Sequence, residues 1–352
     1  MASLVIQQDK RNNMNKTGLT SLVEQAQQAE ESGNFFNASA FYKEALELAI
    51  KAQDSKLIKL CKNKIVEMNK KSIDSGKDFK EVEVSVDISE EDQKGIKENI
   101  EKIIGLENIN TILEAIGCIP WFCPDIKEVD RQSVNSAPIF YQFGNLQTIN
   151  DSGHSLRGGS DPKYSWFMDS YNRTQKFIME IYLNRIFYML IKNKRLTINE
   201  LSKYFSHSGL FDPNQLKIVD IGLGKYFEED YVSALHILVP QFEFFLLHCA
   251  RRLGISTVVL DTKLDVATRT LTLSENHLDS EEFKKIFGGN FCRQVKFVLF
   301  EPLGYKIRHK VAHGEISFKE CNFQTATLIL YLYLFLLGRI GVKDTEKSKP
   351  VK

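Results

Sequence analysis

The segment YVSALHILVPQFEFFLLHCARRL, Tyr231 to Leu253, repeats apolar residues at the three- and four-residue spacing of an α-helix. The apolar residues that share one broad face are Leu235, Leu238, Val239, Phe242, Phe245, Leu246 and Cys249. A face of this width predicts a helix in the core of a larger helical domain. Pro240 lies inside the pattern, and we expect it to kink the helix or to begin a new one. Glu243 lies among three phenylalanines, so its carboxylate must face solvent or find a buried partner.

Helical patterns continue on both sides of this segment. Upstream, apolar residues keep helical spacing over 164–191, and Thr197 with Glu200 three residues later forms a capping box. Downstream, we expect a helix or a pair of helices from Ser280 to Phe300 and an apolar helix from Phe323 to Leu337. The sequence therefore predicts an all-α, mainly helical protein with a helical bundle at its C-terminal end.

Residues 17–75 are expected to form a helical hairpin at the N-terminal end. Helical spacing predicts three helices between Thr17 and Asn69, with a break at Gly33. Small and aromatic residues fall at the spacings of a tetratricopeptide repeat, namely Gly33, Phe36, Ala45 and Ala52. The resemblance is partial, because the bulky first-helix residues and a second copy of the repeat are missing. The hairpin is expected either to dock a protein partner or to cap the rest of the fold.

The middle of the chain is expected to be a linker and an irregular wrapping region, residues 76–163. Val82–Ile88 alternates with period two and predicts a short strand, and a helix is expected around 96–116. Residues 118–162 lack periodicity and are rich in proline and turn residues. The expected order is a disordered N-terminus (1–16), the hairpin (17–75), the linker region (76–163), the helical domain (164–342, with a core at 215–340) and a disordered tail (343–352).

Composition limits the environment of the protein. The formal net charge of +1 gives no global attraction to nucleic acid or membrane, so RNA binding would need a local basic patch. The six cysteines include no C-x-x-C pair, and free thiols in a reducing, cytoplasmic compartment are expected. Cys118 and Cys123 are the closest pair and are expected to be free buried thiols, with a disulfide or half a metal site as alternatives. The apolar run Leu328–Leu337 falls short of the roughly 20 residues that span a bilayer, so it predicts a core helix and no membrane anchor.

The segment EPLGYKIRHKVAHGEI, Glu301 to Ile316, holds the candidate site. Pro302 suits the first turn of a helix and Gly314 suits its C-terminal stop. Between them Arg308 and His313 form an Arg-x4-His motif, with His309 directly after the arginine. This motif, followed by glycine, resembles the signature of the HEPN superfamily of small helical domains. More narrowly, it is similar to an uncharacterised family with Arg-Asn-x-x-x-His-Gly and an upstream Pro-x-x-Glu, matched here by Pro240 and Glu243.

The resemblance covers about residues 215–340 and implies a function. HEPN ribonucleases cleave RNA without a metal or another cofactor, and two protomers usually bring their motifs together across a dimer cleft. The resemblance thus implies Arg308 and His313 as catalytic residues, His309 and Glu243 as supporting residues, an RNA substrate and a homodimer. Such domains often act as toxins or antiviral defence effectors. His309 stands where the narrower family has asparagine, a position that HEPN motifs in general also fill with aspartate or histidine.

The residue types suit this chemistry on physical grounds. A histidine titrates near neutral pH and can act as base or acid, and an arginine offers a planar charged fork that matches phosphate oxygens. Attack by a 2′-hydroxyl restricts the reaction to RNA. On an ideal helix, residues five apart differ in direction by about 140°. Arg308 and His313 therefore converge only if the helix ends near Ala312 and His313 lies on the turn toward Gly314.

Other readings of the motif remain open. His309 and His313 are four residues apart, the spacing of paired metal ligands on a helix, although no third ligand is evident. Arg308 alternatively binds a carboxylate such as Glu243 and has a structural role. A non-catalytic HEPN domain would be a dimerisation or RNA-binding scaffold. Elsewhere, Gly222-x-Gly224 lacks a third glycine for nucleotide binding, and Ser206-His207-Ser208 lacks the context of a nucleophile elbow.

Overall fold

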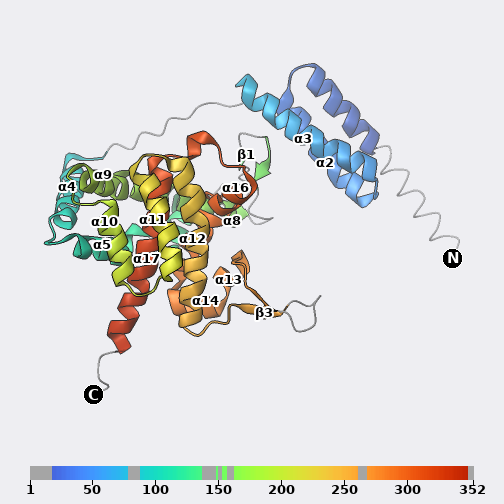
Figure 1. Ribbon diagram of the computed structural model, residues 1–352. Helices are drawn as coiled ribbons and strands as arrows, with labels where there is room; N and C mark the ends of the chain where they lie inside the picture. The colour runs from blue at the N-terminus through green and yellow to red at the C-terminus, as the bar shows by residue number, and fades with distance from the viewer. Residues whose placement is uncertain are drawn as a thin grey trace. The chain divides into compact units, whose positions relative to one another are not determined.

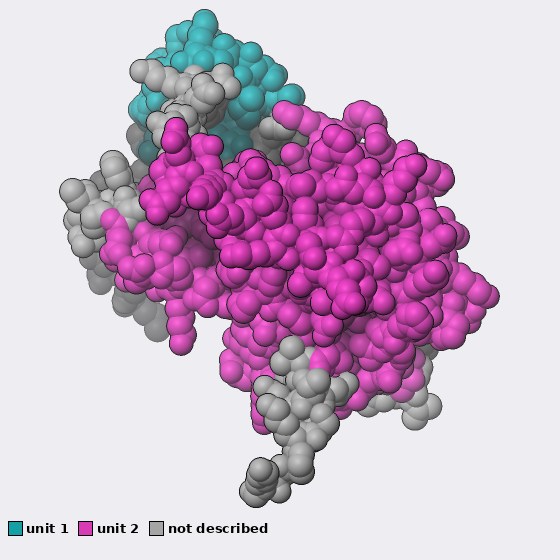
Figure 2. Space-filling model, turned by 90° about the vertical axis from the view of Figure 1, so that its left-hand side faces the viewer, with its two compact units in different colours: residues 1–86, 145–160 teal, residues 87–144, 161–352 magenta. Residues whose placement is uncertain are grey.

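The structure is a computed structural model that describes residues 18–77, 88–136, 148–149, 153–156, 162–260 and 268–347. These residues form an all-α protein, as the helical periodicity predicts (Figure 1). Within the described ranges, strands are confined to two short antiparallel pairs. The chain divides into two compact units, residues 1–86 with 145–160 and residues 87–144 with 161–352 (Figure 2).

The first unit contains the three expected helices. They span residues 18–31, α2 (Phe35–Lys51) and α3 (Ser55–Ser75). Asn34 and Asp54 cap α2 and α3 by accepting backbone N–H groups, which is the usual task of such residues at helix starts. The core of the unit is built largely from small side chains, which allow close helix crossing: Ala26, Ala38, Ala45, Ala49 and Cys61.

A segment far along the chain completes this unit. β1 (Thr148–Ile149) pairs with β2 (Ser155–Leu156), and the Asn69 side chain donates to the Gly153 carbonyl at 2.8 Å. Gly153 has a φ of +84°, and a Cβ there would lie 2.4 Å from the Val66 carbonyl oxygen. The expectation of a linker over 76–163 is therefore wrong for residues 153–156. Their place depends on tertiary contacts with α3 that have no local signal.

The second unit begins with helices in the region that we expected to be linker and wrapping segment. The helix expected around 96–116 is two helices, α4 (Glu90–Ile104) and α5 (Ile109–Cys118). Asn108 starts α5 by accepting the Thr111 N–H at 2.9 Å. A short 3-10 turn (Pro120–Phe122) and α6 (Ile126–Ser136) follow, so the expected irregular structure is wrong here as well. The expected strand Val82–Ile88 lies outside the described residues except for Ile88.

Helix α6 is short and mostly polar, IKEVDRQSVNS, so its few apolar residues give a weak signal in the sequence. Its start is fixed by two side chains. Asp125 accepts the Glu128 N–H at 3.0 Å, and Asn290 accepts the Ile126 N–H at 3.2 Å. Because Asn290 is far away in the sequence, part of this helix start is determined by the tertiary fold.

The long helical pattern over 164–191 is one continuous rod with a π-helical turn. It comprises α8 (Pro162–Ile178), the π segment Met179–Leu183 and α9 (Asn184–Lys192). Thr197 is confirmed as the N-cap of α10 (Ile198–His207), since its hydroxyl oxygen accepts the Glu200 N–H. The reciprocal half differs from a capping box, because the Glu200 carboxylate accepts the Thr197 hydroxyl. α11 (Pro213–Phe227) follows, with Asp212 as its cap.

The segment Tyr231–Arg252 forms a single helix, α12, with Pro240 inside it. No new helix begins at Pro240. β3 (Val258–Leu260) and β4 (Thr268–Thr270) form a ladder that the sequence analysis did not predict. The remaining elements are α13 (Glu275–Asp279), α14 (Glu281–Phe287), α15 (Gly289–Leu299), α16 (Ile307–His313), a 3-10 turn (Phe318–Glu320) and α17 (Phe323–Lys347).

Helix α17 is the central element of this unit and packs against α5, α9, α12, α14 and α15 (Figure 1). Every side chain from Leu328 to Leu336 is at most 2% exposed. A helix that is apolar all round must be buried, which explains the low amphipathicity of the run. α17 continues to Lys347, so residues 343–347 are helical and not part of a disordered tail. The expected disordered residues 1–16 and 348–352 lie outside the described ranges.

Two described helices pass a length and composition test for spanning a bilayer, Tyr231–Arg252 and Phe323–Gly341. The most apolar stretch of the second is 83% buried inside the protein, which favours the expected core helix. All six cysteines are free thiols, and Cys123 is buried as expected, but Cys118 is exposed. Cys118 contacts the Gly338 carbonyl, and Cys123 contacts the Asn290 carbonyl.

Candidate functional site

The turn before α16 sets the direction of the Arg-x4-His segment. The Gly304 N–H donates to the Glu301 carbonyl at 2.9 Å, and the Tyr305 N–H donates to the Phe297 carbonyl at 3.1 Å. A Cβ on Gly304 would lie 2.3 Å from the Phe297 carbonyl oxygen, so only glycine permits this approach. Pro302 lies in this turn and not in the first helical turn, contrary to the expectation from its position. The helix begins five residues later, at Ile307.

The end of α16 agrees with the expected glycine stop. Gly314 has a φ of +67°, and the Glu315 N–H donates to the Lys310 carbonyl at 2.8 Å. This left-handed ending is the common glycine termination of helices. The last helical residue is His313, one residue beyond the end that we expected, and its side chain is exposed.

Glu243 forms an ion pair with Arg308. The Nε of Arg308 donates to Oε2 of Glu243 at 3.1 Å, while Oε1 of Glu243 accepts the Leu273 N–H at 3.0 Å. The guanidinium also lies over the Phe300 ring, 5.7 Å from its centroid. The Arg308 and Glu243 side chains are 28% and 15% exposed, so the ion pair is only partly shielded from water. Among the described residues, Arg308 makes its side-chain hydrogen bond through Nε, which leaves its two terminal nitrogens for another acceptor.

A cavity of about 520 Å³ adjoins this ion pair. Its wall includes the side chains of Arg308, His309 and Lys306. The other lining residues come from the loop before α13, from α13 and from the turn after α15: Leu273, Ser274, Glu275, Asn276, Phe300 and Pro302. His313 does not line this cavity. The structure thus brings together Arg308, His309 and Glu243, and leaves His313 at the exposed end of the same helix.

The two histidines of α16 are neighbours. Their ring centroids are 4.3 Å apart, with 47° between the ring planes. The Nε2 of His309 lies 3.5 Å from a Glu315 carboxylate oxygen. Burial and the nearby Lys306 charge lower the pKa of His309 below its usual 6.5, and Glu315 opposes this shift. At pH 7 the lowered pKa favours the neutral ring, which can accept a proton.

The charges around α16 are largely balanced. Lys310 forms an ion pair with Glu320, and Lys306 lies 4.0 Å from Glu315. Together with the Arg308–Glu243 pair, each cation of this helix start has a carboxylate near it. The local field therefore comes from a few directed groups and not from a broad basic patch.

Among the described residues, the two histidines have no third metal ligand beside them. In the described part of the chain, no group of three or more His, Cys, Asp or Glu side chains is arranged to hold a metal ion. Glu315 approaches His309 alone, and the His309–His313 pair offers two nitrogen ligands at most. Structural zinc sites need four ligands and catalytic zinc sites three from the protein.

Sequence reasoning missed several residues of the cavity. Lys306 lies in the quoted motif segment, and its charge next to Arg308 was an available signal. Ser274, Glu275 and Asn276 carry no such signal, because only the packing of α13 against α15 brings them to the site.

Comparisons with known proteins found no relative of this chain. No protein-family model, no curated protein and no solved structure matches this chain. The resemblance to the HEPN superfamily therefore rests on the motif residues themselves, Arg308 and His313 with Gly314, and on the upstream pair Pro240 and Glu243.

Proposed function

We propose that the chain is a metal-independent endoribonuclease of the HEPN type, with its active site on α16. The observation that carries this proposal is the anchored arginine. Glu243 holds Arg308 through Nε at the wall of a 520 Å³ cavity, so the terminal nitrogens can face a phosphate. Glu243 is a positioning residue in this scheme, because it acts through Arg308.

The reaction needs no group beyond these side chains and the RNA. A neutral histidine takes the proton of a 2′-hydroxyl, the 2′-oxygen forms a bond to the adjacent phosphorus, and the bond from phosphorus to the 5′-oxygen breaks. A protonated histidine gives its proton to that 5′-oxygen, which leaves a 2′,3′-cyclic phosphate and a 5′-hydroxyl. The lowered pKa of His309 suits the base, which makes His313 the acid. Arg308 stabilises the charge that develops on the phosphorane oxygens.

A homodimer is part of this proposal. One protomer supplies one anchored arginine to the cavity, and its His313 lies on the exposed end of α16. A second copy that brings its α16 against the first would form two symmetry-related sites in one cleft, each combining Arg308 of one protomer with His313 of its partner. Light scattering over a range of concentrations should then report about twice 40.4 kDa. A strict monomer at micromolar concentration would contradict a composite site.

The rival function is a non-catalytic HEPN-like scaffold, which dimerises or binds RNA while the hairpin docks a protein partner. The Arg308–Glu243 ion pair favours this reading too, since it ties α16 to α12 and, through the Leu273 N–H, to the loop before α13. A structural arginine of this kind needs no phosphate.

The test is cleavage of a mixed RNA pool by the full chain in the presence of EDTA. Arg308→Lys keeps the charge but loses the planar fork, so we expect cleavage to fall at least about a hundredfold. His309→Ala and His313→Ala should each lower it by a similar factor. His236→Ala, an exposed histidine on α12, is the matched control and should cleave like the unchanged chain.

Two outcomes would overturn the nuclease assignment. Unchanged cleavage by both His309→Ala and His313→Ala would show that α16 is not the active site. Absence of any cleavage by a folded, dimeric wild-type chain would favour the scaffold. A cytoplasmic toxin or defence effector should also arrest growth when expressed, and the arrest should disappear with His313→Ala.

A further inference from the structure

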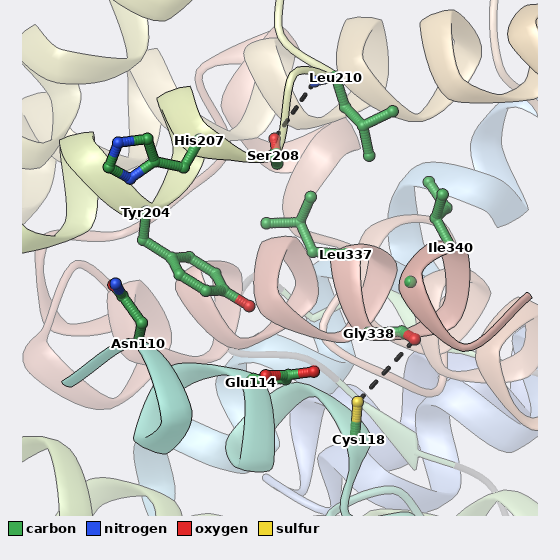
Figure 3. A pocket seen from close by; sticks show the side chains of 11 residues that line it. Asn110, Glu114, Cys118, Tyr204, His207, Ser208, Leu210, Leu337, Gly338 and Ile340 are labelled. Carbon is green, nitrogen blue, oxygen red and sulfur yellow. Dashed lines mark hydrogen bonds between the residues drawn. The ribbon is translucent and has the colours of Figure 1, made fainter. Parts of the chain in front are cut away.

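A second cavity lies in the same unit, between α5, α10 and the C-terminal half of α17 (Figure 3). Its volume is about 310 Å³, at the small end of the range of ligand pockets. The residues that line it are Asn110, Glu114, Cys118, Tyr204, His207, Ser208, Leu210, Leu337, Gly338, Ile340 and Gly341. None of them belongs to the site on α16.

The walls of this cavity are held by an unusually close helix crossing. A Cβ on Gly117 would lie 2.2 Å from the Leu334 carbonyl oxygen, and a Cβ on Gly338 would lie 2.6 Å from the Gly117 carbonyl oxygen. These two glycines bring α5 and α17 together backbone to backbone. Because such a contact leaves little freedom, the cavity is formed before any ligand arrives, which lowers the cost of binding.

The polar side of the cavity is negative. Asn110, Glu114 and Cys118 are four residues apart and share one face of α5. Glu114 forms no ion pair with any residue in the described ranges, and it raises the pKa of both the Cys118 thiol and the Tyr204 phenol, in each case after burial as the larger cause. The Tyr204 ring reaches from α10 toward Glu114 (Figure 3).

The cationic side chains near the α5 side of the cavity do not neutralise the Glu114 carboxylate. Arg339 also acts on Cys118, whose pKa it lowers, but its guanidinium lies over the Phe335 ring at 5.1 Å from the centroid. His207 stands on the α10 side of the cavity (Figure 3). A carboxylate and a phenol oxygen thus face the space together, with no cationic side chain bound to Glu114 among the described residues.

The opposite side of the cavity is apolar. Leu210, Leu337 and Ile340 present aliphatic side chains to the same space (Figure 3). A ligand that fits both sides carries a hydrogen-bond donor with positive charge at one end and an apolar body at the other. Glu114 is an exposed residue, so its carboxylate remains partly hydrated and its repulsion of an anion is screened by solvent. A neutral apolar molecule makes no charge-assisted hydrogen bond to this carboxylate, whereas an ammonium does.

We propose that this cavity binds a small organic cation, a primary ammonium group attached to an apolar body. The ammonium donates to the Glu114 carboxylate and to the Tyr204 oxygen. The apolar body lies on Leu210, Leu337 and Ile340. The site shares no residue with the cavity beside α16, so its test does not depend on RNA cleavage.

The test uses the full chain and 2-phenylethylammonium as the probe, with binding measured by calorimetry. Two matched molecules change only the charged end: 2-phenylethanol is neutral and 3-phenylpropionate is an anion. We expect saturable binding of the ammonium, at least about tenfold tighter than that of the alcohol, and no binding of the anion. Glu114→Gln should weaken ammonium binding by about tenfold or more, and Tyr204→Phe by a smaller factor.

Glu98→Gln is the matched control, since Glu98 is an exposed carboxylate on α4 with no ion pair to a described residue. It should bind the probe like the unchanged chain, and equal melting temperatures should show that all variants are folded. Three results would overturn the proposal: no saturable binding of the ammonium, equal affinity for the alcohol, or equal loss of affinity in Glu114→Gln and Glu98→Gln.

Discussion

Glu243 and Arg308 are 65 residues apart in the chain and form an ion pair, with 3.1 Å between Oε2 and Nε. The pair joins the Pro-x-x-Glu of α12 to the Arg-x4-His of α16, so the two halves of the motif meet in one place. The second carboxylate oxygen of Glu243 accepts the Leu273 N–H at 3.0 Å. One side chain therefore fixes both the arginine and one wall of the cavity.

We predict that this ion pair contributes measurably to stability. Glu243→Ala leaves the Leu273 N–H and the Arg308 guanidinium without their acceptor, so the free energy of unfolding should fall by about 1–3 kcal/mol. Arg308→Ala should cost less than the 3–5 kcal/mol of a fully buried pair, because 28% of the Arg308 side chain is exposed. A double-mutant cycle by urea unfolding should give a coupling energy of about 1 kcal/mol. Strictly additive losses would show that the two side chains do not interact in solution.

Stability should also depend on pH through His309. Its pKa in the folded chain lies below 6.5, mainly because of burial, so the unfolded chain binds the proton more readily. The stability that neutral His309 contributes is therefore fully present above about pH 6.5. It is lost as the pH falls through the pKa of His309 in the folded chain. The pKa of His248 is lowered too, by burial and by Arg252 and Arg251, and acts in the same direction.

The measurement is urea unfolding at pH 7.5 and pH 5.5. The unchanged chain should lose stability at the lower pH, and His309→Gln and His248→Gln should each lose less. His236→Gln is the control, because His236 is an exposed residue of α12 away from the α16 site. A variant that loses as much stability as the unchanged chain would exclude its histidine as a source of the pH dependence.

Two glycines that flank α16 should differ in their tolerance of alanine. At Gly304 the added Cβ would lie 2.3 Å from a backbone oxygen, so Gly304→Ala should destabilise by about 2–4 kcal/mol and shift α16. At Gly314 the added Cβ meets open space, and only the φ of +67° is unfavourable. Gly314→Ala should therefore cost about 1–2 kcal/mol. Thermal unfolding of both variants tests the order, and a larger loss for Gly314→Ala would contradict the tight turn at Gly304.

The two units should fold separately, since their hydrophobic cores share no residue. Removing residues 1–86 and replacing 145–160 with a short flexible linker should leave the second unit with nearly unchanged thermal unfolding. A cut near residue 75 alone should leave residues 145–160 protease-sensitive, because Asn69 no longer binds the Gly153 carbonyl. An insoluble or molten second unit after the first change would show that the hairpin belongs to its core.

Sequence reasoning succeeded where the signal is local. The apolar faces of α12 and α17, the Thr197 cap and the Gly314 stop each follow from a few neighbouring residues. It failed where the structure depends on distant partners. α6 is short and contains few apolar residues, and its start needs Asn290. Pro302 fits a helix start by position, yet the close packing of Gly304 on Phe297 delays the helix to Ile307.

The candidate site shows the same division. The Arg308–Glu243 contact was one of two readings of a carboxylate among phenylalanines, and the geometry selects it. Arg308 and His313 diverge on α16, as the geometry of an ideal helix predicts, because Arg308 lines the cavity and His313 does not. The part of the cavity wall from Ser274 to Asn276 could not be predicted, because nothing in the local sequence indicates that α13 lies near α16.

A mixing experiment tests whether two protomers share one active site. If Arg308 of one protomer works with His313 of its partner, a dimer of one Arg308→Lys chain and one His313→Ala chain has one intact site and one doubly defective site. Random exchange makes half of the dimers mixed, so two inactive variants should recover about one quarter of the wild-type cleavage rate when combined. If both residues act within one protomer, every site in the mixture lacks one of them and no activity returns. Cleavage is measured after the dimers have exchanged by dilution and reconcentration, with each variant alone treated in the same way as the control.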